Sequence, residues 1–416
     1  MSAIVGDLPI AANSELDTML ARKFGRETAN YFSKTPLNRY SFLRGDSPFL
    51  SAALRHPSSR FLLYKNLCPL ISEPSQIYLA TFKEIAELVP ETLYDEPEEV
   101  TVKSFDSSIT QPLVIFLGVD ESRTEDGLSY KIYKGAPYFA VDVTPKGTIA
   151  SQAQAIVDRM EAKGLYFDKT RAPTAFPAGI AALYAQGRHY IDWNNRYTFC
   201  GSCGNKMMSV HAGAKRLCPP TDAALIKKGL SKDGALPPCS SRESVSNVCF
   251  PRTDPTIIVA VLSHDGKRVL LGRQRRWPPK WYSTLAGFVE PAESVEDAVR
   301  REVWEESGVH ISRVVIHSSQ PWPFPENLMI GAIGQTARQS DEEIHLEHDA
   351  ELDDAKWFPI AEVAEALLTG TSSLGEEPGP EYQGGLRLPA KTAIAHQLMK
   401  AVVEGDFWKE THESKI

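Results

Sequence analysis

Residues 287–309 read Gly-Phe-Val-Glu-Pro-Ala-Glu-Ser-Val-Glu-Asp-Ala-Val-Arg-Arg-Glu-Val-Trp-Glu-Glu-Ser-Gly-Val, and no other stretch of the chain is as informative. Ser294 followed by Asp297 is typical of a helix N-cap with a carboxylate three residues later. Apolar residues then recur at helical spacing, and Gly308 stands where a helix ends in a left-handed cap. We therefore predict a helix that begins after Ser294 and ends before Gly308.

Three glutamates near the end of this predicted helix share one face. Glu302, Glu305 and Glu306 stand at positions i, i+3 and i+4, so their carboxylates lie close together. The helix dipole is negative at that end, which makes the cluster unfavourable unless a cation binds there. Oxygen ligands favour Mg²⁺ or Mn²⁺ over zinc. The alternative is a solvated acidic helix face, which is what most glutamate runs are.

The full pattern resembles the signature of the Nudix hydrolases, which cleave a nucleoside diphosphate linked to another group with divalent metal ions. The matching positions are Gly287, Glu293, Arg301, Glu302, Glu305, Glu306 and Gly308. The resemblance implies that Glu302, Glu305 and Glu306 bind metal and act in catalysis. It also implies that Arg301 braces the preceding loop through carboxylates such as Glu293. Alternatively, Arg301 is a surface partner of Glu305.

Five of the six cysteines fall between residues 200 and 249. Cys200 and Cys203 flank a tight turn typical of a zinc knuckle, and Cys218 suits the far side of a ribbon hairpin. Either Cys239 or Cys249 could be the fourth ligand, and we favour Cys239. A redox role for the Cys-x-x-Cys pair is less favoured, because no thioredoxin-like pattern surrounds it. We predict a structural zinc site, whose four thiolates leave no open position for catalysis.

A second motif narrows the family. Residues 319–325 read Ser-Gln-Pro-Trp-Pro-Phe-Pro, which resembles a motif of the NADH pyrophosphatases (NAD-capped RNA hydrolases), including the fungal peroxisomal type. That branch cleaves NAD(H) to nicotinamide mononucleotide and AMP, and carries a four-cysteine zinc ribbon before its Nudix domain. One departure is Asn327, where the family usually has Ser; Asn can still donate and accept hydrogen bonds.

The resemblance assigns further residues to the site. Gln320 matches a glutamine near the substrate, and Phe288 and Phe250 match aromatic residues that stack on a base, the latter from a partner subunit. Both could instead be core phenylalanines. Glu351 matches a downstream carboxylate that reaches the metals. Ala395 resembles a helix-start position whose backbone contacts the ligand.

Composition and termini limit the function classes. The chain of 416 residues is 42% hydrophobic and carries a net charge of −8, which argues against a protein that mainly coats nucleic acid. No apolar run approaches the ~20 residues of a membrane span, and no secretory signal is evident, so we expect a soluble intracellular protein. The final residues 414–416, Ser-Lys-Ile, resemble a peroxisomal address. We expect a peroxisomal or cytoplasmic location.

The predicted architecture is α+β with three parts. Residues 1–190 form an N-terminal Nudix-like lobe, 191–249 a zinc ribbon with an inserted loop, and 250–416 a Nudix α/β/α sandwich. Strands at 256–263 and 268–272 flank a hairpin turn, and a helix at about 178–192 leads into the ribbon. The resemblance also implies a homodimer with sites shared across the two-fold axis.

Three functions follow as hypotheses. The first is a NAD(H) diphosphatase, and the second removes an NAD cap from RNA 5′ ends, where residues 273–276, Arg-Gln-Arg-Arg, could guide a strand. The third is a non-catalytic zinc-ribbon scaffold. In either enzyme, metal ions neutralise the phosphates and activate a water molecule. The sequence does not assign the general base between Glu305 and Glu306.

Overall fold

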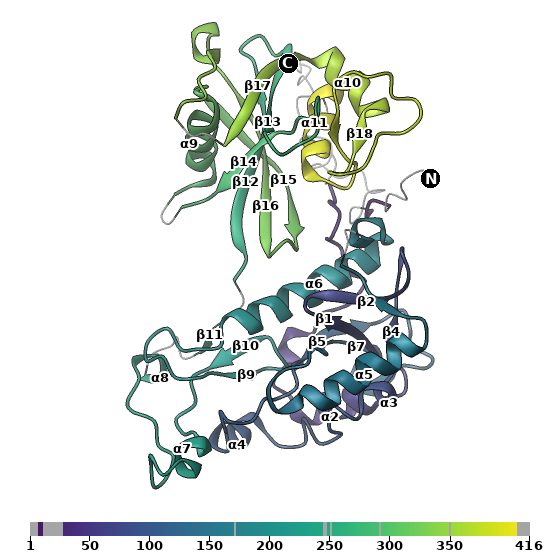
Figure 1. The fold of residues 1–416 in the computed structure, drawn as a ribbon, viewed down its shortest axis with the longest axis vertical. Coiled ribbons are helices and arrows are strands. Elements are labelled where there is room, and N and C mark those ends of the chain that lie inside the picture. Colours follow the sequence, from purple (N-terminus) through teal and green to yellow (C-terminus); the bar gives the residue numbers. More distant parts are fainter. Residues whose placement is uncertain are drawn as a thin grey trace, which may run out of the picture. The chain divides into compact units, whose positions relative to one another are not determined.

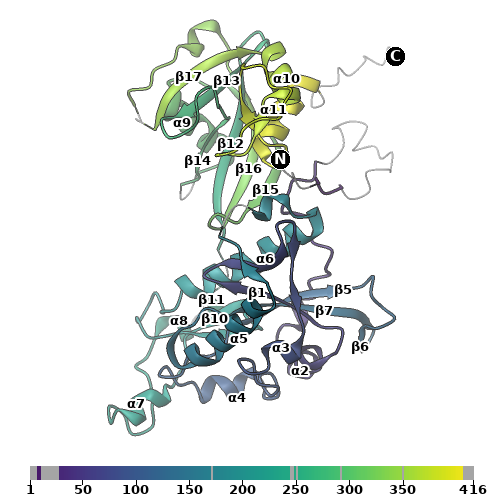
Figure 2. The same ribbon diagram turned by 45° about the vertical axis from the view of Figure 1, so that its right-hand side comes forward.

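The computed structural model describes residues 7–10, 28–169, 172–243, 248–249, 252–290, 293–348 and 351–405. The chain forms two compact units (Figures 1 and 2). The C-terminal unit combines Met1–Lys34, Pro177–Ala181 and Thr253–Ile416, and the N-terminal unit combines Thr35–Phe176 and Ala182–Arg252. The cysteine-rich region thus shares a compact unit with the N-terminal lobe, while residues 28–34 belong with the C-terminal sheet.

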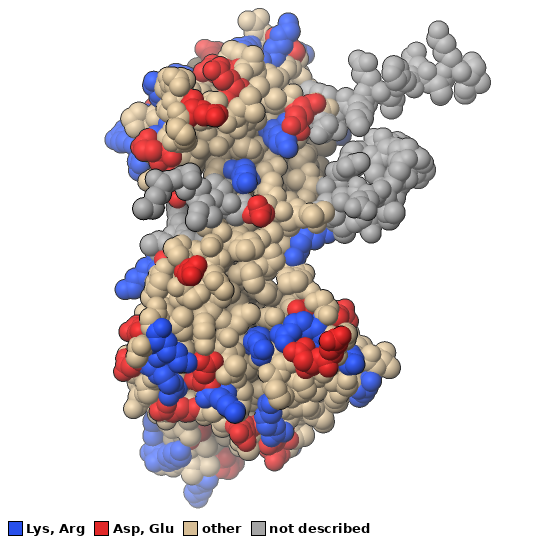
Figure 3. Space-filling view, turned by 90° about the vertical axis from the view of Figure 1, so that its right-hand side faces the viewer, with Lys and Arg blue, Asp and Glu red and all other residues tan. Residues whose placement is uncertain are grey.

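Charged residues of both signs are mixed on one face of the molecule. Lys and Arg side chains alternate with Asp and Glu side chains on the face drawn in Figure 3. That face therefore lacks the broad field of one sign that a protein coating nucleic acid presents. Among the described residues, no helix combines the length and apolar character that a bilayer crossing requires.

A mixed six-stranded sheet forms the centre of the C-terminal unit. Its strand order is β15-β16-β12-β13-β17, and β14 pairs with β12. Strands β12 and β16 are parallel, and the other pairs are antiparallel. The strands are β12 (Asp254–Leu262), β13 (Arg268–Gln274), β14 (Leu285–Phe288), β15 (Arg313–Trp322), β16 (Asn327–Gln335) and β17 (Leu352–Pro359).

Helices cover both faces of this sheet, which confirms the predicted α/β/α sandwich (Figure 1). Helix α9 (Val295–Ser307) packs on one face, and α10 (Ile360–Thr369) and α11 (Ile394–Glu404) pack on the other. Residues 257–262 of the central strand β12 are all apolar because alternate residues serve two cores. Ile257 belongs to the α9 core and Ile258 to the α11 core. The short strands β18 (Thr371–Ser372) and β19 (Leu388–Pro389) follow α10.

The capping signals of α9 are confirmed. The Ser294 hydroxyl accepts a hydrogen bond from the backbone N–H of Asp297. At the other end, Gly308 has φ 76°, a left-handed conformation that glycine adopts without a Cβ penalty. The helix therefore begins and ends where local sequence predicts, and this sets the rotation of its glutamates.

An eight-stranded sheet lies at the centre of the N-terminal unit. Five of its strands follow the order β3-β2-β1-β7-β5. The other three pair at its sides: β4 with β1, β6 with β7 and β8 with β2. Helix α5 covers one face, and Gly187 of α6 packs closely on Tyr64 and Ala140 at the other. The strands are β1 (Arg60–Lys65), β2 (Cys68–Glu73), β3 (Gln76–Ile77), β4 (Leu79–Ala80), β5 (Val114–Asp120), β6 (Leu128–Tyr130), β7 (Tyr133–Asp142) and β8 (Tyr166–Phe167). The helices are α2 (Ser47–Arg55), α3 (Phe82–Ile85), α4 (Glu98–Lys103), α5 (Ala150–Ala162) and α6 (Ala178–Arg196).

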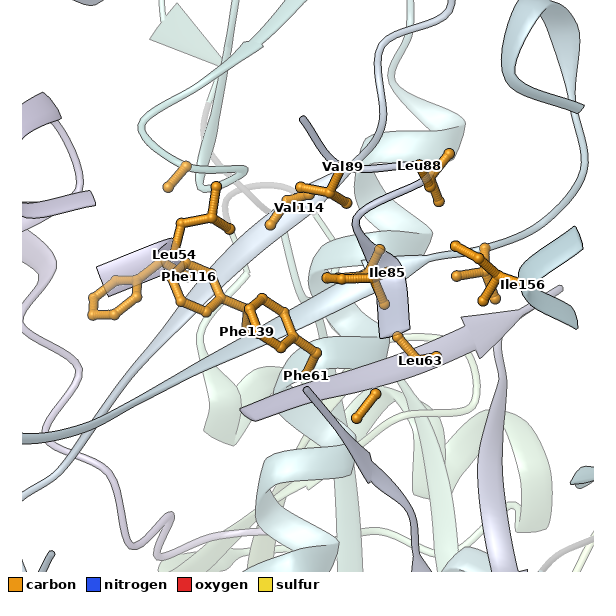
Figure 4. Packing of buried hydrophobic residues seen from close by; sticks show 14 of the residues in the cluster. Leu54, Phe61, Leu63, Ile85, Leu88, Val89, Val114, Phe116, Phe139 and Ile156 are labelled. Carbon is orange, nitrogen blue, oxygen red and sulfur yellow. The ribbon is translucent and has the colours of Figure 1, made fainter. Parts of the chain in front are cut away.

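Aliphatic and aromatic side chains together fill the core under α5 (Figure 4). The rings of Phe61 and Phe139 stack with centroids 5.3 Å apart, and Phe116 contacts Phe139 at 5.5 Å. Burying such rings stabilises the fold by about 1.5–3 kcal/mol each. The N-terminal unit therefore has a hydrophobic core of its own, to which the C-terminal sheet contributes no residue.

The cysteine-rich part of this unit is a small three-stranded sheet. Strands β9 (Met208–Val210), β10 (Lys215–Leu217) and β11 (Val248–Cys249) pair in the order β11-β10-β9. The inserted segment between β10 and β11 contains α7 (Ala223–Lys227) and α8 (Ser240–Glu243). A hairpin of β9 and β10 therefore presents Cys218 at its end, as predicted.

Candidate active site

The glutamate cluster of α9 packs against the end of strand β14. Strand pairing with Ile257 of β12 holds the backbone of Gly287 in place. A Cβ atom at Gly287 would lie 1.9 Å from Cδ of Glu302 and 2.2 Å or less from both of its oxygens. Only glycine leaves room for this carboxylate, so the first fixed position of the motif shapes the pocket for the glutamates.

Arg301 connects the cluster to the loop before α9. Its Nε and Nη2 atoms donate to the two oxygens of Glu293, both at 2.8 Å, in a bidentate pair. Its Nη1 donates to Glu302 and to Glu305, each at 2.9 Å. Nη2 also donates to the carbonyl of Phe288 at 2.8 Å. The predicted bracing through Glu293 is confirmed, and the surface pair with Glu305 is present as well.

These carboxylates are partly removed from water. Glu306 is 5% exposed, and the Glu302 side chain is 15% exposed. Burial raises the pKa of Glu302, and the charges of Glu305 and Glu351 raise it further against the opposing effect of Arg301. Glu351, the residue before β17 (Leu352–Pro359), is thus close enough to Glu302 for their charges to interact.

This donor set fits a hard divalent cation. Carboxylates from two segments, α9 and the residue before β17, interact electrostatically where negative charge is already unfavourable. A cation would relieve that repulsion, and oxygen-only ligands are those that Mg²⁺ and Mn²⁺ prefer. The residues that could hold it are Glu302, Glu305, Glu306 and Glu351.

Two other predicted site residues, Gln320 and Phe288, lie at the two ends of one row of the sheet. Gln320 pairs with Met329, Met329 with Thr256, and Thr256 with Phe288. Three strand spacings separate the two ends of the row by roughly 14 Å. Adjacent residues of a strand face opposite sides, so Phe288 points away from the face on which Gly287 meets Glu302. The carboxylates and Phe288 thus flank the end of β14.

The two candidate stacking residues differ in what the structure shows. Phe288 is 57% exposed, so the alternative that it is a core phenylalanine is wrong. Its ring is available to a planar ligand. Phe250 lies outside the described residues. Its proposed role in the partner subunit's site stays a prediction.

Gln320 is 1% exposed and bound to backbone groups. Its Nε2 donates to the carbonyls of Tyr31 and Thr392, and its Oε1 accepts from the N–H of Ile394 at 2.9 Å. Gln320 thus fixes the start of α11, where Ala395 is also buried. The structure brings these two predicted residues together; their contact with a ligand stays a prediction.

Sequence reasoning missed the contribution of Asn30 to this region. Its amide is almost fully buried and donates to Ser318 Oγ and to the Ser319 carbonyl on the edge strand β15. Phe32 packs edge-on against Trp322 of the proline-rich motif, with ring centroids 6.0 Å apart. Asn327, the departure from the family motif, is buried and donates to Thr256 Oγ1, so it stabilises the row that ends in Phe288.

Four sulfur atoms gather at the end of the β9–β10 hairpin. The Sγ atoms of Cys200, Cys203, Cys218 and Cys239 all lie within 4.8 Å of one another. Two of the pairs are 3.8 Å and 3.7 Å apart. A tetrahedral zinc with Zn–S bonds of roughly 2.3 Å places its sulfurs roughly 3.8 Å apart. The donor set therefore fits a structural zinc, and Cys239 completes the cluster.

The thiols of this cluster differ in pKa. Burial raises the pKa of Cys218 to about 12, whereas the hydroxyl of Ser241 lowers that of Cys239 to about 6. Cys249 instead ends β11 opposite Arg216 of β10. It therefore lies in the ribbon, as predicted.

Comparison with known proteins finds two domain models in the chain. The NUDIX domain matches residues 252–375, and the NADH pyrophosphatase-like rudimentary NUDIX domain matches residues 58–193. The first match contains the glutamates of α9 and Glu351. The second falls on the eight-stranded sheet, consistent with the Nudix-like lobe predicted there.

Curated relatives span most of the chain. NAD-capped RNA hydrolase NUDT12 of Homo sapiens is 34% identical over 383 residues, which cover 90% of this chain and 73% of that protein. NAD-capped RNA hydrolase NPY1 of Saccharomyces cerevisiae is 34% identical over 400 residues, 90% of this chain and 95% of that protein. The mitochondrial NAD(P)H pyrophosphatase NUDT13 of Homo sapiens is 29% identical over 386 residues, 91% of this chain and 93% of that protein.

Proposed function

The chain belongs to the Nudix hydrolases, in the branch with an NADH pyrophosphatase-like rudimentary Nudix domain, and we propose that it hydrolyses the pyrophosphate of NAD(H). The products are nicotinamide mononucleotide, reduced or oxidised, and AMP. The same reaction on an NAD-capped RNA releases nicotinamide mononucleotide and leaves an RNA with a 5′-monophosphate. Relatives named for each of these two activities share most of the chain.

One observation carries this proposal most directly. The carboxylate of Glu302 occupies the space that a Cβ of Gly287 would need, while Arg301 holds the same carboxylate through Nη1. A solvated acidic face has no such pocket, because its side chains point freely into water. The intact cluster also weighs against a non-catalytic scaffold, which would be free to lose these residues.

Each group of the site has a separate role in the proposed reaction. A divalent cation bound there neutralises phosphate charge and lowers the pKa of a water molecule. Arg301 keeps Glu302 and Glu305 in place, and Phe288 offers an exposed ring on the opposite side of β14. A dinucleotide that uses both would pass around the end of β14, with its diphosphate on the glutamate side. Glu305 is the more exposed candidate for accepting a proton from water, with 37% of its side chain accessible.

We assign Mg²⁺ or Mn²⁺ to the glutamates and zinc to the cysteines. The oxygen donors support the first assignment, and the sulfur spacing supports the second. The zinc has a structural role, because it joins the knuckle at Cys200 to the hairpin end at Cys218. Four thiolates leave no coordination position for a substrate.

Two further features are proposed from the sequence. A homodimer would complete the aromatic clamp with Phe250 of a second copy, and light scattering of the purified protein tests it. Residues 414–416 lie outside the described residues, and their Ser-Lys-Ile pattern supports a peroxisomal location. Imaging a tagged protein with and without this tripeptide tests that location.

A panel of dinucleotides tests the proposed activity. Purified protein is incubated with NADH, NAD⁺, NADPH and ADP-ribose in Mg²⁺ or Mn²⁺, and AMP release is followed by chromatography. We expect AMP, or its 2′-phosphate from NADPH, together with the mononucleotide. Release of AMP from ADP-ribose alone would exclude the dinucleotide assignment.

A further inference from the structure

Two arginines project from the tip of a turn beside the active site. The backbone N–H of Trp277 donates to the carbonyl of Gln274 at 3.0 Å, so Arg275 and Arg276 are the central residues of a four-residue turn. Both are exposed, and the Arg275 side chain is 91% accessible. The turn directly follows β13.

This turn stands at the same end of the sheet as the glutamate cluster. Gln274 is paired with Leu352 at the end of the β13–β17 ladder. Arg275 follows Gln274, and Glu351 precedes Leu352, so the two lie next to one another just beyond that pair. Glu351 in turn acts electrostatically on Glu302. The arginines therefore border the carboxylates of the active site.

The positive charge of the turn is only partly neutralised. Asp353 forms an ion pair with Arg273, and the Arg275 guanidinium reaches the same carboxylate at a longer distance of 3.5 Å. Arg276 donates to the neutral amide oxygen of Gln274 at 2.9 Å, and no carboxylate partner of Arg276 is found in the described part of the chain. The carboxylate of Asp353 thus pairs with two of the three arginines, Arg273 and Arg275, and Arg276 is left with a neutral partner.

Buried aromatic contacts support the base of the turn. Trp281 is 5% exposed and donates from Nε1 to the carbonyl of Ser372. Trp277 packs on it edge to face, with ring centroids 4.8 Å apart. The two arginines are therefore presented from a supported turn. A supported turn loses less conformational entropy when it binds a ligand than a flexible one.

We propose that Arg275 and Arg276 bind backbone phosphates of the RNA chain that continues beyond the adenosine of an NAD cap. This deepens the proposed function, on which it rests. Free NADH ends at that adenosine and offers no further phosphate, whereas capped RNA continues as a polyanion. Guanidinium groups pair well with phosphate oxygens. The turn thereby favours capped RNA over the free dinucleotide without changing the chemistry at the diphosphate.

The test compares two substrates in one set of variants. We measure kcat/KM for NADH and for a 5′-NAD-capped RNA of about 20 nucleotides, with the wild type and Arg275→Ala/Arg276→Ala. In the alanine variant, we expect the ratio of kcat/KM for capped RNA to kcat/KM for NADH to fall roughly five-fold or more. The slope of log kcat/KM against log salt for the RNA should weaken by about 1.4, since each phosphate contact on a single strand contributes about 0.7.

Matched variants separate charge from structure. Lys267→Ala removes an exposed cation at the other end of β13 and should leave both the ratio and the salt slope unchanged. Arg275→Lys/Arg276→Lys should restore most of the ratio, because Lys and Arg both neutralise a backbone phosphate.

Several outcomes would overturn the proposal. One is an unchanged ratio in the alanine variant, and another is an equal loss on NADH and on RNA. A selective loss on NADPH would show that the turn binds the 2′-phosphate instead. A wild type that hydrolyses NADH but not capped RNA would refute this inference alone, whereas one inactive on both would refute the proposed function.

Discussion

Replacing Gly287 by alanine tests the geometry of the active site with a single added methyl group. The new Cβ would lie 1.9 Å from Cδ of Glu302, about 1.5 Å short of an ordinary van der Waals contact. The backbone of Gly287 cannot retreat without breaking its pairing with Ile257 of β12. The Glu302 carboxylate must therefore move, and its hydrogen bond with Arg301 must break or rearrange.

The expected loss is large for catalysis and small for stability. Misplacing a catalytic group by about 1 Å can cost about 100-fold in rate, which corresponds to about 2.7 kcal/mol. The Glu302–Arg301 pair is partly exposed, and such a pair contributes up to about 1 kcal/mol. For a unit of this size that lowers Tm by about 2–4 °C.

The assay is AMP release from NADH at saturating Mg²⁺, together with a thermal melt. Gly379→Ala is the matched control, because a Cβ at Gly379 meets no atom within 4 Å. We expect kcat to fall at least about 100-fold in Gly287→Ala and to stay near the wild-type value in Gly379→Ala. Wild-type kcat in Gly287→Ala would refute the account of this pocket.

Two further predictions concern stability. Cys239→Ser removes one of the four clustered sulfurs, so we expect bound zinc to fall and Tm to drop by at least about 5 °C. The control, Cys68→Ser, should change neither the zinc content nor Tm. Metal analysis and thermal melts of both variants check this prediction. Burial disfavours ionised Glu342, but hydrogen bonds from the backbone and ring of His264 and the charge of Arg268 hold its pKa below the usual value. A lowered folded pKa contributes stability above the unfolded value of about 4.3 and loses it as pH falls through the folded value. The Tm difference between wild type and Glu342→Gln should therefore be largest near neutral pH and shrink below about pH 4.3; a difference independent of pH would contradict this.

Features with short-range causes were predictable from the sequence. The bounds of α9 follow from Ser294 and Gly308, because capping depends on residues within a few positions. The spacing of Cys200, Cys203 and Cys218 also indicated the cluster, since a knuckle and a hairpin end are local structures. For the fourth member the sequence favoured Cys239 and left Cys249 open, because both follow an inserted segment, and the tertiary structure places Cys239 in the cluster.

Features that join distant segments were not predictable in this way. Asn30 bonds to Ser318 across 288 positions, and nothing in its neighbourhood marks it as a buried donor. Motif resemblance placed Gln320 near the substrate, but the structure shows its amide bonded to backbone groups around the start of α11. Resemblance identifies which residue matters, whereas the hydrogen-bond partners show what its side chain contacts.

The most direct measurement is metal-dependent AMP release from NADH by Glu305→Gln. This change removes one negative charge from the cluster and keeps the size of the side chain. Glu296→Gln, in the first turn of the same helix, is the control for the amide substitution. We predict that Glu305→Gln loses hydrolysis at every Mg²⁺ or Mn²⁺ concentration with an unchanged circular dichroism spectrum, while Glu296→Gln stays active. Full activity of Glu305→Gln would contradict the assignment of these carboxylates to the catalytic metal site.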